Sequence, residues 1–341
     1  MSIAAGLAGI LFLVVFALMP LQWVSVGAPW ASLVVVFFVI PLIDMWVGPP
    51  RVARPPAARM RGASFARWIP RVQLLLQSIL LIQATRIAAT LSWGELLFFG
   101  AAVGTVTGGL GITIAHELMH RGALIDRVIA KALLVSVAYG HFVVEHVRGH
   151  HVRVGTAEDP ATAPRGMSVY RFIVRSVVGT FIHAWRLEAM RLQHQRRSAW
   201  NLRNWTLTGS LISIGLLLLV TSVGGPKAAV LFVVQAAWAI ALLETINYIE
   251  HYGLQRKRIG ARFEAVREEH SWNADFVVSN WMLFNLQLHP DHHINIERSY
   301  EQLRTVASAP QLPAGYPAML LLAFVPPAWF AVMDRRIPQF A

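Results

Sequence analysis

The strongest constraint in this sequence is a series of apolar stretches, each about as long as a lipid bilayer is thick. A helix that crosses a bilayer needs about 20 mostly apolar residues. Six stretches approach that length: residues 3–24, 30–47, 72–91, 96–115, 207–223 and 228–249. A backbone inside lipid must satisfy its own hydrogen bonds. The sequence therefore predicts an all-α integral membrane protein, a bundle of six transmembrane helices in a single domain over residues 1–341.

The basic residues predict how this bundle is oriented. Of the 30 Lys and Arg residues, 28 lie in three segments. These are the segment directly after the second span, residues 116–206, and the part of the chain beyond residue 250. Because cytoplasmic loops carry an excess of Lys and Arg, both termini and the segments 116–206 and 250–341 should be cytoplasmic. The expected location is a bacterial inner membrane. The formal net charge of +12 then reflects topology rather than nucleic acid binding.

Histidines mark the candidate site. Nine of the 13 histidines lie in four groups: His116 and His120 in HELMH; His146, His150 and His151 in EHVRGHH; His251 in NYIEHYGL; and His289, His292 and His293 in LQLHPDHH. Spacings of three and four residues place two rings on one helix face. Imidazole is a ligand for iron, copper, nickel and zinc. Because nine imidazoles exceed what one ion holds, the pattern predicts two metal ions at the cytoplasmic ends of the spans.

Acidic residues accompany these histidines. Four of them adjoin a candidate ligand: Glu117, Glu145, Glu250 and Asp291. A histidine that binds a metal usually donates its second N–H to a carboxylate or carbonyl, which gives these acids a supporting role. Glu244 shares a face of the sixth span with Asn247 and His251, and an ionisable group within a span is a functional candidate. His141, His183 and His194 are isolated and predicted to be structural or interfacial, whereas His270 is left open.

Several motifs together resemble a known family. They are IPLIDMWVG (40–48), HELMHR, EHVRGHHVRVGTAEDPAT (145–162), NYIEHYGL, SWNADFVVSN (271–280), LQLHPDHHINIERSYEQLR (286–304) and LPAGYPAML near the C-terminal end. In these motifs the chain resembles the integral-membrane alkane monooxygenases, which are related to the membrane fatty-acid desaturases and hydroxylases. The NYIEHYGL motif is the one that separates the alkane type from the desaturases.

This resemblance implies a di-iron centre held by the nine histidines and O₂-dependent hydroxylation of alkanes to primary alcohols. Electrons would come from NAD(P)H through rubredoxin reductase and rubredoxin, and the hydrocarbon would enter from the bilayer. The sequence has no cysteine and cannot itself hold rubredoxin's iron, so the donor is expected to be a separate chain. Met119, Val147, Leu288 and Pro290 stand where the family usually has Gly, Asn, Arg and Ser, which bears on the substrate more than on the chemistry.

Alternative functions remain open at this point. A lipid desaturase or a methyl-aromatic hydroxylase would use related histidine clusters, and their products would distinguish them. An intramembrane zinc protease would use HELMH with Glu117 as general base, but it leaves six histidines unexplained. A non-enzymatic metal transporter should carry its histidines inside the spans. Two further predictions are that Val36 lines a substrate channel and that Arg256, Lys257 and Arg258 dock the electron donor.

Overall fold

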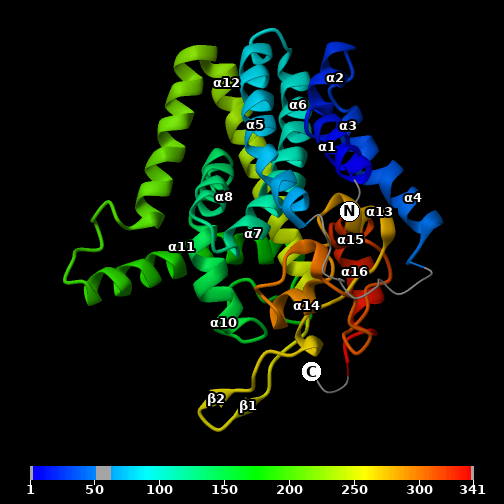
Figure 1. Ribbon diagram of the computed structural model, residues 1–341, viewed down its shortest axis with the longest axis vertical. Helices are drawn as coiled ribbons and strands as arrows, with labels where there is room; N and C mark the ends of the chain where they lie inside the picture. The colour runs from blue at the N-terminus through cyan, green and yellow to red at the C-terminus, as the bar shows by residue number, and fades with distance from the viewer. Residues whose placement is uncertain (1–2, 51–62, 339–341) are drawn as a thin grey trace. The chain divides into compact units, whose positions relative to one another are not determined.

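The computed structural model describes residues 3–50 and 63–338 (Figure 1). Part of the predicted basic segment after the second span, including Arg51, Arg54, Arg59 and Arg61, lies outside these described residues. Chain contacts define two compact units. Unit 1 comprises Met1–Val36, Pro55–Val143 and Leu207–Leu242, and unit 2 comprises Phe37–Arg54, Val144–Thr206 and Leu243–Ala341.

Unit 1 is built from helices. They are α1 (Ile3–Ala17), α2 (Met19–Ser25), α3 (Ala31–Val34), α5 (Ala63–Ala88), α6 (Trp93–Val106), the π-helix η2 (Thr107–Ile112), α7 (Thr113–Met119), α8 (Leu124–Ser136) and most of α12 (Trp205–His251). Ser92 begins α6, because its side chain and that of Glu95 each bond the other's backbone N–H. This cap ends the short link after α5 that the sequence predicts.

Unit 2 combines short helices with one long helix and a small β-hairpin. The π-helix η1 (Val35–Val39) leads into it. Its other elements are α4 (Ile40–Val47), η3 (His146–His150), α10 (His151–Arg153), α11 (Val169–His194), β1 (Arg258–Ile259), β2 (Arg262–Phe263), η4 (Glu268–His270), α13 (Val277–Met282), α14 (His289–Ile294), η5 (Tyr300–Gln302), α15 (Tyr316–Ala323) and α16 (Pro326–Met333). The short helix α9 (Phe142–Glu145) precedes η3.

Two helical stretches in the described residues are long and apolar enough to cross a membrane. They are Trp93–Met119, which joins α6, η2 and α7, and Trp205–His251, which is α12. Helix α12 turns back on itself at Gly225, whose φ of 70° suits glycine (Figure 1), so it covers both predicted spans 207–223 and 228–249. The prediction of a mostly helical chain is confirmed, and these two helices have the length and apolar composition of membrane spans. The six-span count, the cytoplasmic orientation and the single domain stay predictions.

Glycines bring two of these helices close together within unit 1. A β-carbon on Gly104 would lie 2.6 Å from the backbone oxygen of Gln235, and one on Gly108 would lie 2.9 Å from the Cα of Ala239. Small residues permit such close backbone contact, which stabilises helix pairs in lipid. The α6–η2 segment therefore packs directly on the second arm of α12.

Unit 1 also buries a set of neutral polar side chains. Gln77 of α5 donates to the hydroxyl of Ser136 at 2.7 Å, and Gln235 of α12 donates to the Ser136 carbonyl at 3.0 Å. The Gln235 side-chain oxygen accepts from Thr107 at 2.9 Å. Because an unpaired polar group in an apolar interior is costly, these mutual bonds are what allow amides in this core.

The 26-residue helix α11 is not among the helices that the sequence predicts, and it lies within the segment 116–206 that is predicted to be cytoplasmic. Its face buries Val169, Phe172 and Leu187, whereas its other side carries exposed Arg residues. Near its end, Glu188 accepts hydrogen bonds from Arg148, Arg191 and the backbone N–H of Trp205. Burial by itself would raise the pKa of Glu188, but these bonds lower it to about 2.

Candidate metal centre

Four buried histidines converge in unit 2, and we call them the four-histidine group: His150, His251, His289 and His293. One nitrogen of each ring lies within 4.8 Å of the others. The Nε2 atom of His289 is 3.2 Å from that of His251 and 2.9 Å from that of His293. His289 and His293 lie one turn apart on α14, so a single helical turn supplies two of the four rings.

Proton positions in this group favour a bound cation. A neutral imidazole has one N–H donor and one bare nitrogen. The Nδ1 of His150 lies 2.9 Å from the Asp159 carboxylate, and the Nδ1 of His251 lies 3.2 Å from the His270 carbonyl. Both acceptors place the proton on Nδ1, so the Nε2 atoms of His150 and His251 present lone pairs to the same small space. The buried Nε2 of His150 has no hydrogen-bond partner. This arrangement fits a metal ion held by neutral imidazoles.

Three more predicted ligands lie close together in unit 2: His146, His151 and His292. The Nε2 of His151 is 3.0 Å from that of His146 and 3.2 Å from that of His292. The π-helical turn η3 explains the first contact, because its wider turn brings residues five apart over one another. π-helical turns are frequent at functional sites.

The remaining two predicted ligands belong to unit 1. His116 lies on α7, and His120 follows its last residue. Their ring centroids are 5.1 Å apart, as the spacing of four residues predicts. Their part in a shared metal centre stays a prediction.

The predicted acidic partners occupy different surroundings. Glu250 accepts from the Tyr316 hydroxyl at 2.9 Å and lies 3.3 Å from the His289 Nε2. Glu145 lies 3.1 Å from the Nδ1 of His183, a residue predicted to be structural or interfacial. Three other acids have non-histidine contacts: Glu244 with Asn247, Asp291 with Arg298, and Glu117 with Arg121. Glu250 is therefore in direct contact with a candidate ligand.

Two residues that support ligands were not identified from the sequence in this role. Asp159 accepts from the Thr162 hydroxyl and the Ala161 N–H as well as lying against His150. His270 supports His251 through its backbone carbonyl rather than its ring. The EDP sequence within the 145–162 motif could have suggested Asp159, whereas no side-chain pattern signals a carbonyl.

A third cluster, Glu264, Glu269 and His270, also has the composition of a metal site. However, the Nδ1 of His270 accepts the Arg267 backbone N–H at 2.9 Å, which places the ring proton on Nε2. That Nε2 lies 3.4 Å from Glu264 and donates toward it, so it has no lone pair for a metal. Burial is the main cause that lowers the pKa of His270, in keeping with a neutral ring. The cluster therefore fits a structural contact.

Unit 1 contains a cavity of about 410 Å³. Its wall comes from α5, α8 and both arms of α12, and includes Leu81, Leu216 and Phe232. Its few polar wall residues include Gln77 and Gln235, whose amides are already hydrogen-bonded to protein groups. Such a lining suits a hydrocarbon chain. The predicted channel residue Val36 is half-buried in η1, and its role stays a prediction.

Buried histidine nitrogens within a helical membrane protein define the class: a histidine-rich, metal-binding membrane protein. The sequence profile of the family described as "Fatty acid desaturase" matches residues 91–323. Alkane 1-monooxygenase 2 of Pseudomonas aeruginosa is 39% identical over 335 residues, covering 93% of this chain and 88% of that protein. Alkane 1-monooxygenase 1 of the same species is 39% identical, covering 91% and 84%.

A third relative, the alkane 1-monooxygenase of Ectopseudomonas oleovorans, is 41% identical over 252 residues, which are 74% of this chain and 63% of that protein. The chain therefore belongs to the fatty acid desaturase family and, within it, to the alkane 1-monooxygenases. The family resemblance noted in the sequence motifs is confirmed.

Proposed function

We propose that this protein hydroxylates the terminal carbon of alkanes to give primary alcohols at two iron ions held by the nine histidines. The observation that carries the proposal is the four-histidine group, whose bare ring nitrogens face one another in a buried space. Family membership supplies the type of reaction. One oxygen atom of O₂ enters the C–H bond, and the other leaves as water with two electrons and two protons.

The residues have separable roles in this proposal. The four-histidine group holds one of the two irons. When bound, the irons supply the activation of O₂. Asp159 and the His270 carbonyl keep the protons of His150 and His251 on Nδ1, so that each Nε2 faces the metal. The apolar cavity of unit 1 provides a place for a hydrocarbon chain that arrives from the bilayer.

The decisive experiment combines the purified full-length protein with rubredoxin, its reductase, NAD(P)H and isotopically labelled O₂. The substrates are n-alkanes of several lengths, methyl-substituted aromatics and fatty acyl lipids, with products identified by mass spectrometry. Labelled 1-alkanols and about two irons per chain support the proposal, and the His293→Ala protein serves as the inactive control. Alkenes as the sole products would instead indicate a desaturase, and one zinc with proteolysis would indicate a protease.

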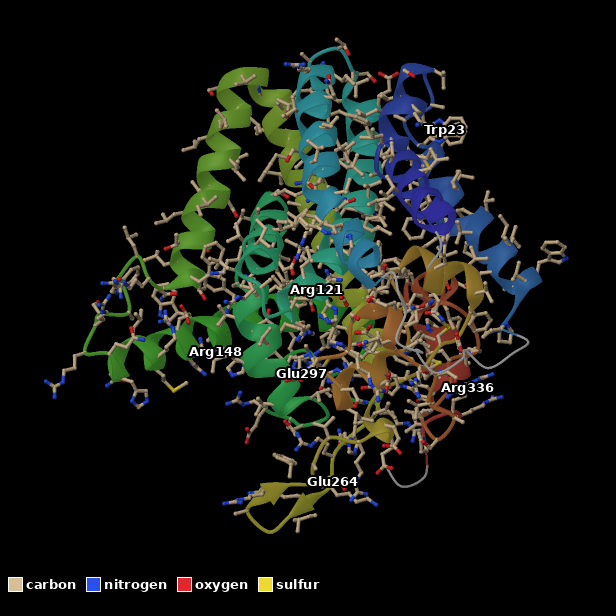
Figure 2. The ribbon with its side chains drawn as sticks, viewed as in Figure 1. Trp23, Arg121, Arg148, Glu264, Glu297 and Arg336 are labelled. Carbon is tan, nitrogen blue, oxygen red and sulfur yellow. The ribbon has the colours of Figure 1, made fainter. Side chains whose placement is uncertain are left out.

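Electrons should arrive from rubredoxin, the donor that the family resemblance implies. Of the three basic residues predicted to dock rubredoxin, Arg256 is the one that this proposal leaves out. The half-buried guanidinium of Arg256 donates to the backbone oxygens of Glu264 and Val152, and so has a structural role. The exposed basic side chains on or beside the β1–β2 hairpin, near Glu264 in Figure 2, are Lys257, Arg258 and Arg262. We call these three residues the hairpin surface.

Salt dependence tests the hairpin surface. Complementary charge raises association rates, and exposed charges are screened beyond about 8 Å at physiological ionic strength. Reversing all three charges to Glu should raise the apparent KM for rubredoxin and weaken its salt dependence, while iron content stays constant. A triple reversal at the exposed Arg171, Arg186 and Arg196 matches the change in net charge. Equal behaviour of the two triple variants would remove the hairpin surface as the docking site.

A further inference from the structure

Three of the motifs that mark the family contain no histidine, and the proposed reaction gives them no role: IPLIDMWVG, SWNADFVVSN and LPAGYPAML. In unit 2 one buried chain of hydrogen bonds joins all three. It begins at Asp44, continues through Ser279, Gln287 and Tyr316, and ends at Glu250 beside His289. These motifs therefore meet at the edge of the four-histidine group.

The chain of hydrogen bonds begins where Asp44 of α4 meets the start of α13. One carboxylate oxygen of Asp44 accepts the backbone N–H groups of Val278 at 3.0 Å and Ser279 at 3.1 Å. The other oxygen accepts the Ser279 hydroxyl. Asp44 is only 2% exposed, so three donors satisfy a carboxylate that has almost no contact with solvent. These three hydrogen bonds fix the position of Asp44 at this end of the hydrogen-bond chain.

The next links reach Tyr316. The Gln287 amide donates to the Ser279 hydroxyl at 2.8 Å, and its oxygen accepts the Tyr316 backbone N–H at 2.6 Å. A β-carbon on Gly315 would overlap both Asp44 and Ser279, so only glycine fits immediately before Tyr316. The Tyr316 side chain is fully buried at the start of α15. Its position is therefore set from both the backbone and the neighbouring glycine.

The last link connects Tyr316 with the ligands. Its hydroxyl donates to one oxygen of Glu250 at 2.9 Å, which leaves the other oxygen 3.3 Å from the Nε2 of His289. This is the same nitrogen that faces His251 and His293. A hydrogen bond to one carboxylate oxygen fixes the rotation of the whole Glu250 carboxylate. Tyr316 thus determines where the second oxygen of Glu250 lies.

We propose that Tyr316, anchored through Gln287 and Ser279 to Asp44, is a positioning residue that holds the Glu250 carboxylate against the four-histidine group and so strengthens metal binding there. Four neutral imidazoles bring no negative charge to a divalent ion, and a buried carboxylate at this distance supplies one. The inference rests on the metal centre of the proposed function but not on its substrate. Partners that surround metal ligands typically change metal affinity or activity by about 10–100-fold.

The test compares Tyr316→Phe with Tyr248→Phe in the full-length iron-loaded protein. Each change removes one hydroxyl from a buried ring, and the Tyr248 hydroxyl donates to the Met167 carbonyl at 2.8 Å rather than to a carboxylate beside a candidate ligand. For Tyr316→Phe, the chelator concentration that removes iron from the most labile site should fall about 10-fold. The d–d absorption spectrum of the cobalt-substituted protein should also shift. Tyr248→Phe should leave both readings unchanged.

Two further variants complete the test. Glu250→Gln should lower metal retention, and adding Tyr316→Phe to it should have little further effect, because both changes act through one carboxylate. Asp44→Asn, which loses an acceptor for the Ser279 hydroxyl, should give a smaller change in the same direction. If Tyr316→Phe and Tyr248→Phe retain iron equally, or if the Tyr316 and Glu250 effects add fully, the proposal is wrong. These readings require no substrate, so they stand apart from any failure of alkane hydroxylation.

Discussion

Two buried glutamine amides of unit 1 and the four-histidine group of unit 2 are satisfied in different ways. In unit 1, the amides of Gln77 and Gln235 meet hydroxyls and carbonyls, so that each donor has an acceptor. In unit 2, the four-histidine group brings ring nitrogens against other ring nitrogens at about 3 Å. Neutral imidazoles cannot supply enough protons for all of those contacts.

This difference separates a set of buried amides that is complete in the protein alone from a histidine group that is completed by a cation. Hydrogen bonds in unit 1 permit polar residues among membrane helices and require no ligand. The histidine contacts of unit 2 become favourable when a metal ion replaces the shared protons, so binding and folding are coupled there. Mutations in the two units should therefore fail in different ways.

The largest expected effect follows from removing a ligand of the four-histidine group. His293→Ala should lower hydroxylation by more than about 100-fold, because the loss of a ligand exceeds the 10–100-fold cost of losing an outer partner. Iron should fall from about two per chain toward one, as measured by elemental analysis. Because a buried imidazole is removed, the metal-free protein should be no less stable than metal-free wild type. Full activity in this variant would end the metal assignment.

Removing the metal should affect the two units unequally. A ligand present at 100 times its Kd stabilises the folded state by about 2.7 kcal/mol, and chelation removes that contribution. Hydrogen exchange should then increase around η3 and α14, whereas amides of α6 should keep their protection. The measurement is exchange mass spectrometry with and without chelator. Uniform loss of protection across both units would contradict the distinction.

A smaller effect is expected at Glu188, whose charge is balanced by arginines rather than by metal. Glu188→Gln should cost about 3 kcal/mol, the lower end for a broken buried pair, because Arg148 and Arg191 keep 38% and 32% of their side chains exposed. The pKa of Glu188 is lowered from 4.5 to about 2. The wild-type advantage is therefore complete above pH 4.5 and disappears as the pH falls toward 2. Melting curves of both proteins across this range test the sign.

The smallest effect concerns the neutral bonds of unit 1. Gln235→Leu removes the acceptor of Thr107 and the donor to Ser136, and should lower the free energy of unfolding by about 1–3 kcal/mol. Iron content and the cobalt spectrum should match those of wild type. Ser78→Ala, which removes a hydroxyl bonded to its own helix backbone at an exposed site, provides a control with little effect. Loss of iron in Gln235→Leu would show that the units are not independent in this respect.

The sequence predicts the helical membrane class because apolar length is a direct consequence of bilayer thickness. Local spacing similarly predicts that His116 with His120, and His289 with His292, lie together. Residues that only tertiary folding brings together have no regular spacing in the sequence. The carbonyl of His270 and the hydroxyl of Tyr316 reach their partners over 19 and 66 residues, and only the folded chain shows these contacts.

The basic segment after His251 illustrates a second limit. Sequence charge suggests that Arg256 is available to a partner, but its guanidinium donates to the backbone oxygens of Glu264 and Val152. Amphipathic α11 was missed for a related reason, since its mixed apolar and basic residues resemble a solvated loop when read without periodicity. Net charge and composition do not show which charged side chains form hydrogen bonds with the protein's own backbone.

The π-helical turn η3 has a consequence for how this segment can change during evolution or engineering. His150 and His151 are adjacent in the chain, yet their nitrogens join different sets of histidines. The extra residue of the π turn is what directs the two adjacent rings to different sets of histidines. Deleting one residue there would rotate the rest of the helix by about 100° and move both rings away from their sets. The segment should therefore accept substitutions between its histidines but no change in length, and a transplanted copy would have to include the π turn itself.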